Sequence, residues 1–202
     1  MKVAIVGGAT QALNEIAPKV QSPEWEIWGL NAIRPPWNPR WTRMFNLHLW
    51  AHLVRDWAHG VRADINWAQA NPTVPFYVLD PWRPGTLPNQ RIFPREEIAA
   101  MEPRGLVDYH AGSFDWLVPF AVLLGADEIS LHGINLFNET GEPISARPCL
   151  EYWCGYAAGR GVRVSVASDC AALFAQYHYV RSDTVYGYDD VQLIEDRRRG
   201  RG

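Results

Sequence analysis

Glycine and polar residues follow each short apolar run that the sequence offers as a buried strand. Such runs alternate with helical patterns, which is typical of parallel βα units. The carboxyl ends of parallel strands meet at one edge of the sheet, and open α/β sheets bind their ligands there. We therefore expect a nucleotide-sized site at that edge. The residues that follow the six predicted strands are Gly7, Gly8, Thr10, Asn31, Asn46, His48, Asp80, Asn135, Ser168 and Asp169.

Two turns offer a helix N-terminus to an anion. Gly7 and Gly8 have no side chains, so their backbone N–H groups can approach a phosphate; the alternative is that they only make a tight turn. The pair is not part of a GxGxxG or P-loop motif, and Asn31 takes the place of the acidic residue that NAD-binding units carry. Gly112 and Ser113 open a second predicted helix, where the serine either caps the helix or donates to the ligand.

Three side chains are candidates for general base. His48 follows a predicted strand, and Glu139 and Glu142 lie in a polar loop after another. Solvation alone would explain the two glutamates equally well. His52 lies four residues after His48, a spacing that suits a metal, but only Asp56 offers itself as a third ligand, so no metal site is predicted. His110 precedes the second turn and could reach the ligand.

These patterns predict one Rossmann-like α/β domain over residues 1–180, a mostly parallel sheet with helices on both faces. Residues 181–202 are expected to form a C-terminal extension with a basic tail and an edge hairpin near 185–193. Residues 81–94 contain four prolines and are predicted to be a long surface loop. The strands are expected at 3–6, 26–30, 42–45, 75–79, 128–131 and 162–166, and the helices at 11–20, 50–57, 62–70, 95–101, 113–124, 146–159 and 171–177.

Composition narrows the class of protein. Of the 202 residues 48% are apolar, which is enough for a core, and a net charge of -3 argues against a general nucleic-acid binder. Contact with nucleic acid through the tail remains an alternative to a solvated end. No apolar window is long enough to span a membrane. Three cysteines without metal-ligand spacing favour reduced thiols in a cytoplasmic protein. Monomer and homo-oligomer both stay open. The tail arginines are Arg197, Arg198, Arg199 and Arg201.

The order of several short motifs resembles one family. Residues 112–114 (GSF), a helix ending at Leu124 and Gly125, and residues 128–135 (EISLHGIN) resemble the small bacterial sialyltransferases, the related pterin-diphosphokinase-like proteins and phage-encoded relatives. Residues 6–10 (VGGAT) are similar to the GNGPS turn of that group, and residues 168–174 (SDCAALF) to its NSLLANF segment. Asn31 and Asn46 fall where the family carries asparagines. The likeness extends over roughly residues 3–175.

The resemblance implies a nucleotide site in which Gly8, Asn31, Asn46 and Ser113 surround the sugar and phosphates. The ligand would be a cytidine nucleotide sugar or another nucleoside phosphate. Where the sialyltransferases carry a catalytic histidine, residues 137–147 contain none. We therefore expect a nucleotide-dependent transferase, a glycosyltransferase with a nucleotide-sugar donor. One alternative is a non-catalytic nucleotide binder that sequesters or senses its ligand, and another is diphosphotransfer or nucleotide hydrolysis with Mg²⁺ at Asp80, although no motif indicates Mg²⁺.

Overall fold

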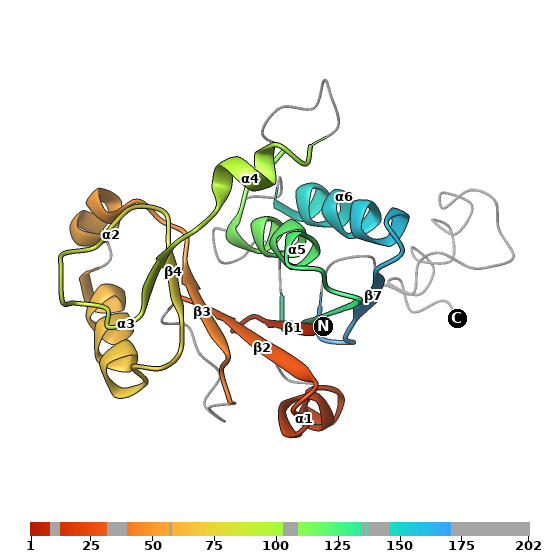
Figure 1. Ribbon diagram of the computed structural model, residues 1–202, viewed down its shortest axis with the longest axis horizontal. Coiled ribbons are helices and arrows are strands. Elements are labelled where there is room, and N and C mark those ends of the chain that lie inside the picture. Colours follow the sequence, from red (N-terminus) through yellow and green to blue (C-terminus); the bar gives the residue numbers. More distant parts are fainter. Residues whose placement is uncertain are drawn as a thin grey trace, which may run out of the picture.

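The computed structural model of the chain describes residues 1–8, 13–31, 40–56, 58–102, 109–134, 136 and 146–170. Figure 1 shows these residues as one layered α/β unit. In chain order its elements are β1 (Lys2–Val6), α1 (Leu13–Gln21), β2 (Trp25–Leu30), β3 (Arg43–Asn46), α2 (Trp50–Asp56), α3 (Ala58–Ala70), β4 (Phe76–Val78), β5 (Gln90–Ile92), α4 (Arg95–Ala99), α5 (Ser113–Leu123), β6 (Glu128–His132), α6 (Ala146–Gly159) and β7 (Arg163–Val166).

The strands form a single parallel sheet in the order β5-β4-β3-β2-β1-β6-β7. β1 lies in the interior of the sheet because its residues 3–6 are apolar and buried on both faces. The chain builds outward from β1 to β5 and then returns to add β6 on the other side of β1. The strand order therefore switches between β1 and β6. The predicted α/β, Rossmann-like fold class is confirmed.

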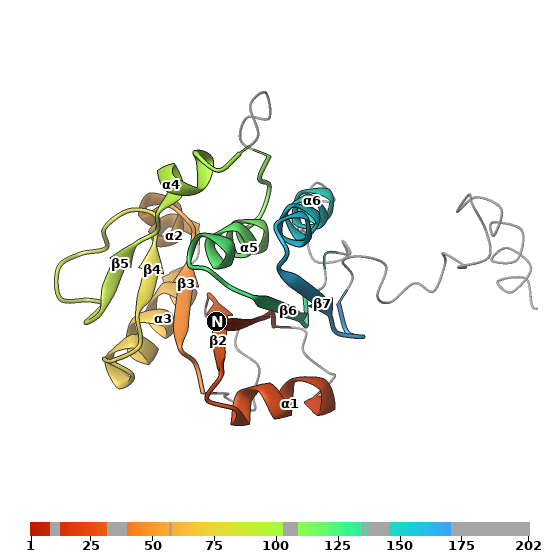
Figure 2. The same cartoon turned by 45° about the vertical axis from the view of Figure 1, so that its right-hand side comes forward.

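Two separate apolar cores cover the two faces of the sheet. Val3 and Ile5 of β1 pack into the core formed with α4, α5 and α6. Ala4 and Val6 point the other way, into the core formed with α1, α2 and α3. Figures 1 and 2 show α4, α5 and α6 together on one side of the sheet and α1 on the opposite side. The alternation of side chains along a strand produces this division.

Helix α5 is apolar on most of its circumference, as expected for a helix that packs against both the sheet and α6. It begins at Ser113, where the sequence placed a helix start. Its end is marked by Gly125, whose φ of 78° is the left-handed conformation that commonly terminates helices. The predicted bounds of α5 and α6 are confirmed to within one residue.

The predicted long loop at residues 81–94 is wrong in its final third. Residues Gln90–Ile92 form β5, a parallel edge strand whose Gln90 pairs with Phe76 of β4. Three residues between Pro88 and Pro94 are too few to show an alternating pattern, so pairing with β4 decides their conformation. Helix α3 also begins four residues before its predicted start. The predicted helix at 171–177, the hairpin at 185–193 and the domain boundary at 180 lie outside the described residues.

Candidate functional site

A pocket of about 270 Å³ lies at the carboxyl ends of β2 and β3, against the N-terminus of α5. Open parallel sheets bind ligands at this edge. The pocket brings together four of the residues that the sequence proposed for the site, from three separate segments of the chain. Its lining consists of Leu30, Asn31, His48, Ala111, Gly112, Ser113, Phe114, Asp115, Leu136 and Ala146.

Asn31 ends β2 in an uncommon conformation. Its φ is 54°, in the left-handed region, which asparagine tolerates better than most residues. The backbone N–H donates to the Phe45 carbonyl at 2.7 Å, which ties this turn to β3. Its buried Oδ1 has no hydrogen-bond partner among the described residues. A buried acceptor without a partner costs about 1–3 kcal/mol, so Oδ1 is well suited to receive a hydrogen bond from a ligand.

At the N-terminus of α5 the capping group is Asp115. Its Oδ2 accepts hydrogen bonds from the Ala111 N–H at 2.7 Å and the Gly112 N–H at 2.9 Å. Within the described part of the chain, Ser113 makes no side-chain hydrogen bond, and it lines the pocket. The sequence left two uses open for Ser113, which were to cap the helix or to donate to the ligand. In the structure Asp115 does the capping.

His110 lies behind Asp115 and is not among the residues that line the pocket. Its Nδ1 is 3.4 Å from Asp115 Oδ1, and its Nε2 is 3.3 Å from Glu102 Oε1. The three side chains are only 1–6% exposed. The imidazole is stacked between Trp116, with ring centroids 3.4 Å apart, and Trp153, at 4.9 Å. The prediction that His110 reaches a ligand is replaced by a role in holding Asp115, because two indole rings enclose it.

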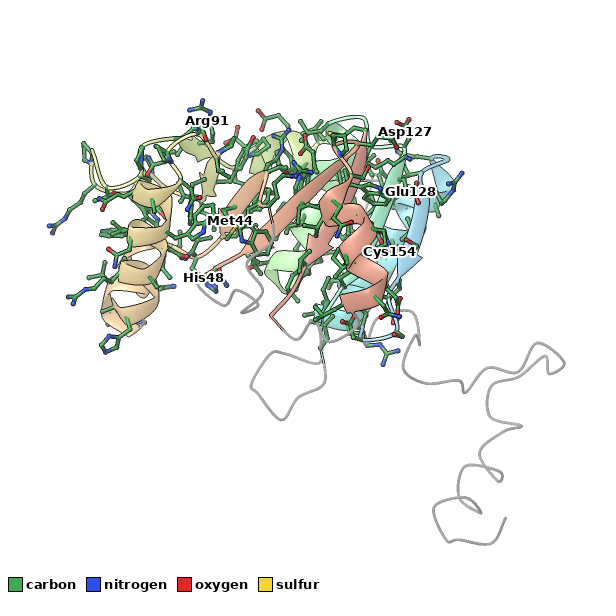
Figure 3. The ribbon with its side chains drawn as sticks, turned by 90° about the horizontal axis from the view of Figure 1, so that it is seen from below. Met44, His48, Arg91, Asp127, Glu128 and Cys154 are labelled. Atoms are coloured by element: carbon green, nitrogen blue, oxygen red, sulfur yellow. The ribbon has the colours of Figure 1, made fainter. Side chains whose placement is uncertain are left out.

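His48 lies just beyond the end of β3 (Figure 3) and is one of the residues that line the pocket. Its backbone N–H donates to Asn46 Oδ1 at 3.3 Å, which fixes the start of the turn. Burial lowers the pKa of His48, and the nearby His52 lowers it further. The imidazole is therefore neutral at neutral pH, the form that accepts a proton as a general base.

Asn46 is fully buried and does not line the pocket. Its Nδ2 donates to Asp64 Oδ2 of α3 at 2.9 Å, and its Oδ1 accepts the His48 N–H. Both ends of the amide are thus used within the protein. Asn46 joins β3 to α3 and positions His48. In the structure Asn46 therefore has a supporting role, whereas the sequence predicted a contact with the ligand.

Gly7 is required by the close approach of two backbones. Its N–H donates to the His132 carbonyl at 2.8 Å, and a Cβ at this position would lie 2.3 Å from the Gly133 carbonyl oxygen. This geometry favours the tight-turn interpretation of Gly7. Gly8 is exposed, and neither glycine lines the pocket.

Three other residues that follow predicted strands make hydrogen bonds within the protein. The side chain of Asp80 accepts the Trp50 N–H at 3.0 Å at the start of α2. Ser168 bonds to Glu15, and Asp169 accepts the Gly133 N–H at 2.9 Å. Among the described residues, no group of three or more His, Cys, Asp or Glu side chains is placed to hold a metal ion. Four predicted site residues lie outside the described part of the chain, namely Thr10, Asn135, Glu139 and Glu142.

The three cysteines are unpaired and buried, as the sequence indicated. Burial raises the pKa of Cys154 and of Cys170 to about 12, and it also raises the pKa of Cys149. All three stay thiols at neutral pH, so none is an activated nucleophile.

In the part of the chain that is described, no helix has both the length and the apolar character needed to cross a bilayer.

Sequence reasoning did not identify the apolar walls of the pocket. These side chains look like ordinary core residues in the sequence, and only their position at strand ends and helix starts marks them. They are Leu30, Phe114, Leu136 and Ala146.

No family model, no curated protein and no solved structure matches the chain. The resemblance to the small bacterial sialyltransferases therefore stays a prediction, which is based on the order of short motifs.

Proposed function

We propose that the chain is a nucleotide-dependent transferase, a glycosyltransferase that holds the nucleoside part of a nucleotide-sugar donor in this pocket. The observation that carries the proposal is the convergence of Asn31, His48 and the N-terminus of α5 on one hollow at the carboxyl edge of the sheet. Nucleotides bind at this edge in doubly wound α/β proteins.

The size of the pocket suits a single nucleoside. At about 270 Å³ it lies just below the roughly 300 Å³ at which pockets for drug-sized ligands begin. Leu30, Phe114 and Leu136 provide apolar surface for the faces of a base or a ribose. The phosphates and the transferred sugar would extend beyond this hollow, along the sheet edge toward the exposed Gly8.

The charges around the pocket also favour an orientation in which the phosphates lie outside it. No lysine or arginine is among the described residues that line the pocket, whereas the Asp115 carboxylate is part of its wall. A phosphate beside that carboxylate would be repelled. Hydroxyl groups are preferred there, because the buried Asn31 Oδ1, which has no hydrogen-bond partner among the described residues, can only accept. The nucleoside therefore enters the pocket, and the phosphates remain outside it.

The chemistry assigned to His48 is proton removal from the acceptor. The neutral imidazole takes the proton of an acceptor hydroxyl while that oxygen forms a bond to the anomeric carbon of the donor sugar. The bond between the anomeric carbon and the phosphate oxygen breaks, and its electron pair leaves with the nucleotide. Glu139 and Glu142 remain the alternative bases for this step.

Thermal unfolding with CMP, UDP, GMP and their sugar conjugates tests binding. At least one of these compounds should raise the Tm of the wild-type protein. Ser113→Trp places an indole in the pocket and should abolish the shift, whereas Gln69→Trp, on an exposed position of α3, should retain it. If no compound shifts the Tm, or if Ser113→Trp still responds, the pocket is not a nucleotide site.

Mass spectrometry of the incubated ligand tests catalysis. Release of free CMP or UDP in the presence of an acceptor supports the transferase. Recovery of the intact nucleotide sugar from a protein that binds it would instead favour the non-catalytic binder that sequesters or senses its ligand.

A further inference from the structure

A second hollow lies between α2, α3 and the turn that follows β4. Its volume is about 330 Å³, and α2 and α3 lie next to β4 at one end of the sheet (Figure 1). We call it the α2–α3 groove. It is lined by Trp50, Val54, Ala58, Val61, Arg62, Ile65, Arg83 and Thr86.

The floor and one side of the α2–α3 groove are apolar. Val61 is buried, and Ile65 and Trp50 are partly buried against the core beneath them. Trp50 packs on the buried Trp82, with ring centroids 5.1 Å apart. Val54 remains 49% exposed. Apolar surface gathered in a concave site is a common mark of ligand binding.

The two charged side chains among the described residues of the groove are both cationic. Arg62 comes from α3 and Arg83 from the turn after β4, and both are exposed. Within the described part of the chain, neither guanidinium forms an ion pair, and no carboxylate lines the groove. Asp64 is on the same helix but points into the core, where it accepts from Asn46. Two guanidiniums thus stand beside apolar surface in a chain whose net charge is -3.

We propose that the α2–α3 groove binds a small amphipathic anion, with its apolar body on Trp50, Val61 and Ile65 and its acidic head between Arg62 and Arg83. Burial of the body removes apolar surface from water. The planar guanidiniums suit the oxygens of a carboxylate, sulfonate or phosphate, with which they form strong charge-assisted hydrogen bonds. This site is separate from the proposed nucleotide pocket and does not depend on it.

The volume of the groove favours a small molecule over a protein partner. A stable protein–protein interface buries roughly 1,200–2,000 Å² in total, far more than a hollow of this size offers. A ligand with one or two rings, or with a medium-length acyl chain, fits the groove.

The matched probes for this site are 1-anilinonaphthalene-8-sulfonate and its uncharged relative N-phenyl-1-naphthylamine. Both carry the same aromatic body, and only the first carries an anionic head. Fluorescence titration of the wild-type protein should give tighter binding of the sulfonate. The double variant Arg62→Gln/Arg83→Gln should weaken sulfonate binding about tenfold or more, since it removes the charge-assisted hydrogen-bond donors that face the anionic head. Binding of the uncharged probe should change little.

Three further proteins control the experiment. Arg91→Gln removes an exposed arginine of β5 that lies outside the groove (Figure 3), and it should leave both probes unaffected. Val54→Asp adds a carboxylate to the exposed side of the groove and should weaken the sulfonate. Ser113→Trp blocks the nucleotide pocket and should leave sulfonate binding intact. Dodecanoate should displace the sulfonate, and dodecanol should not.

The proposal is overturned if the double variant binds the sulfonate as the wild type does. It is equally overturned if the uncharged probe binds as tightly as the sulfonate, or if Ser113→Trp abolishes binding. Because the probes are not nucleotides, failure of the nucleotide proposal leaves this test unaffected.

Discussion

The two hollows of the molecule are built from different parts of the fold and carry opposite polarity. The pocket is formed by strand ends and a helix N-terminus, and its polar wall contains the acceptors Asn31 and Asp115 with no cation among the described lining residues. The α2–α3 groove is formed by the sides of two helices and the turn after β4, and its described lining residues include two arginines and no carboxylate. Strand ends supply backbone turns and short polar side chains, whereas helix sides supply long side chains and apolar stripes. The first therefore suits the hydroxyls of a nucleoside, and the second an anionic head with an apolar body.

The largest expected effect concerns catalysis in the pocket. His48→Gln should lower turnover roughly 10²–10⁴-fold, the usual contribution of a general base. His52→Gln, which changes an exposed histidine of α2 four residues further along the chain, should retain full turnover. Steady-state release of free nucleotide is the measurement. If both variants keep their activity, the base is Glu139, Glu142 or another group.

Turnover in the pocket should depend on pH, whereas sulfonate binding in the α2–α3 groove should not. Because the pKa of His48 is lowered, its neutral form persists to pH values below the ordinary imidazole range, and turnover falls only when the pH drops through the lowered pKa. Arginine side chains in general remain protonated in proteins, so sulfonate binding should stay level. Parallel pH profiles of turnover and of sulfonate binding check this. A joint decline would mean that acid acts on the whole fold instead of on His48.

Asp115→Ala should destabilise the protein, at a cost of roughly 1–3 kcal/mol for each N–H group that loses its acceptor. It leaves His110 without Nδ1 support and the Ala111 and Gly112 N–H groups without their acceptor. Urea unfolding gives the free energy, with the exposed Glu97→Ala as the matched control. An unfolding free energy equal to that of the control would contradict the role of Asp115 in shaping the pocket.

Acid should weaken the fold through His132, which lies on β6 outside both hollows. Burial lowers the pKa of this fully buried imidazole to about 4. Between about pH 6.5 and pH 4 the His132 imidazole is protonated in the unfolded chain and neutral in the folded protein. Stability from this group is therefore complete above pH 6.5 and is lost as the pH falls to 4, by about 3 kcal/mol in total.

Urea unfolding at pH 7 and pH 4.5 measures this loss. His132→Gln removes the titrating group and should flatten the pH dependence, whereas the exposed His59→Gln should not. Equal slopes in all three proteins would assign the acid sensitivity to other groups.

The smallest effect expected is that of Gly7→Ala. Because the added Cβ would meet the Gly133 carbonyl, β1 and β6 must shift, at a cost of roughly 1–3 kcal/mol, typical of overpacking. Nucleotide affinity below the unfolding temperature should remain unchanged, since Gly7 does not line the pocket. Calorimetric titration compares the affinities with those of Gly8→Ala, which alters the exposed neighbour. Loss of affinity in Gly7→Ala alone would restore the phosphate-binding interpretation of this turn.

Much of the candidate pocket could be predicted because its residues occupy positions that local patterns mark. Asn31 and His48 follow apolar strands, and Gly112 and Ser113 open a helix. The sequence could not show that Asn46 turns inward to Asp64, eighteen residues away. Nor could it show that Trp116 and Trp153 enclose His110. These outcomes depend on contacts between elements, which periodicity does not encode.

By itself the sequence determined the fold class, six of the strands in the sheet and the edge at which polar residues gather, because hydrophobic periodicity and turn residues act over a few neighbouring positions. The tertiary structure alone decided that Gln90–Ile92 joins the sheet as β5, that Gly7 serves backbone packing, and that Arg62 and Arg83 share a groove. Strand order and helix packing bring together residues that are distant in the chain. Contacts of that range determine which polar groups are used inside the protein and which remain for a ligand.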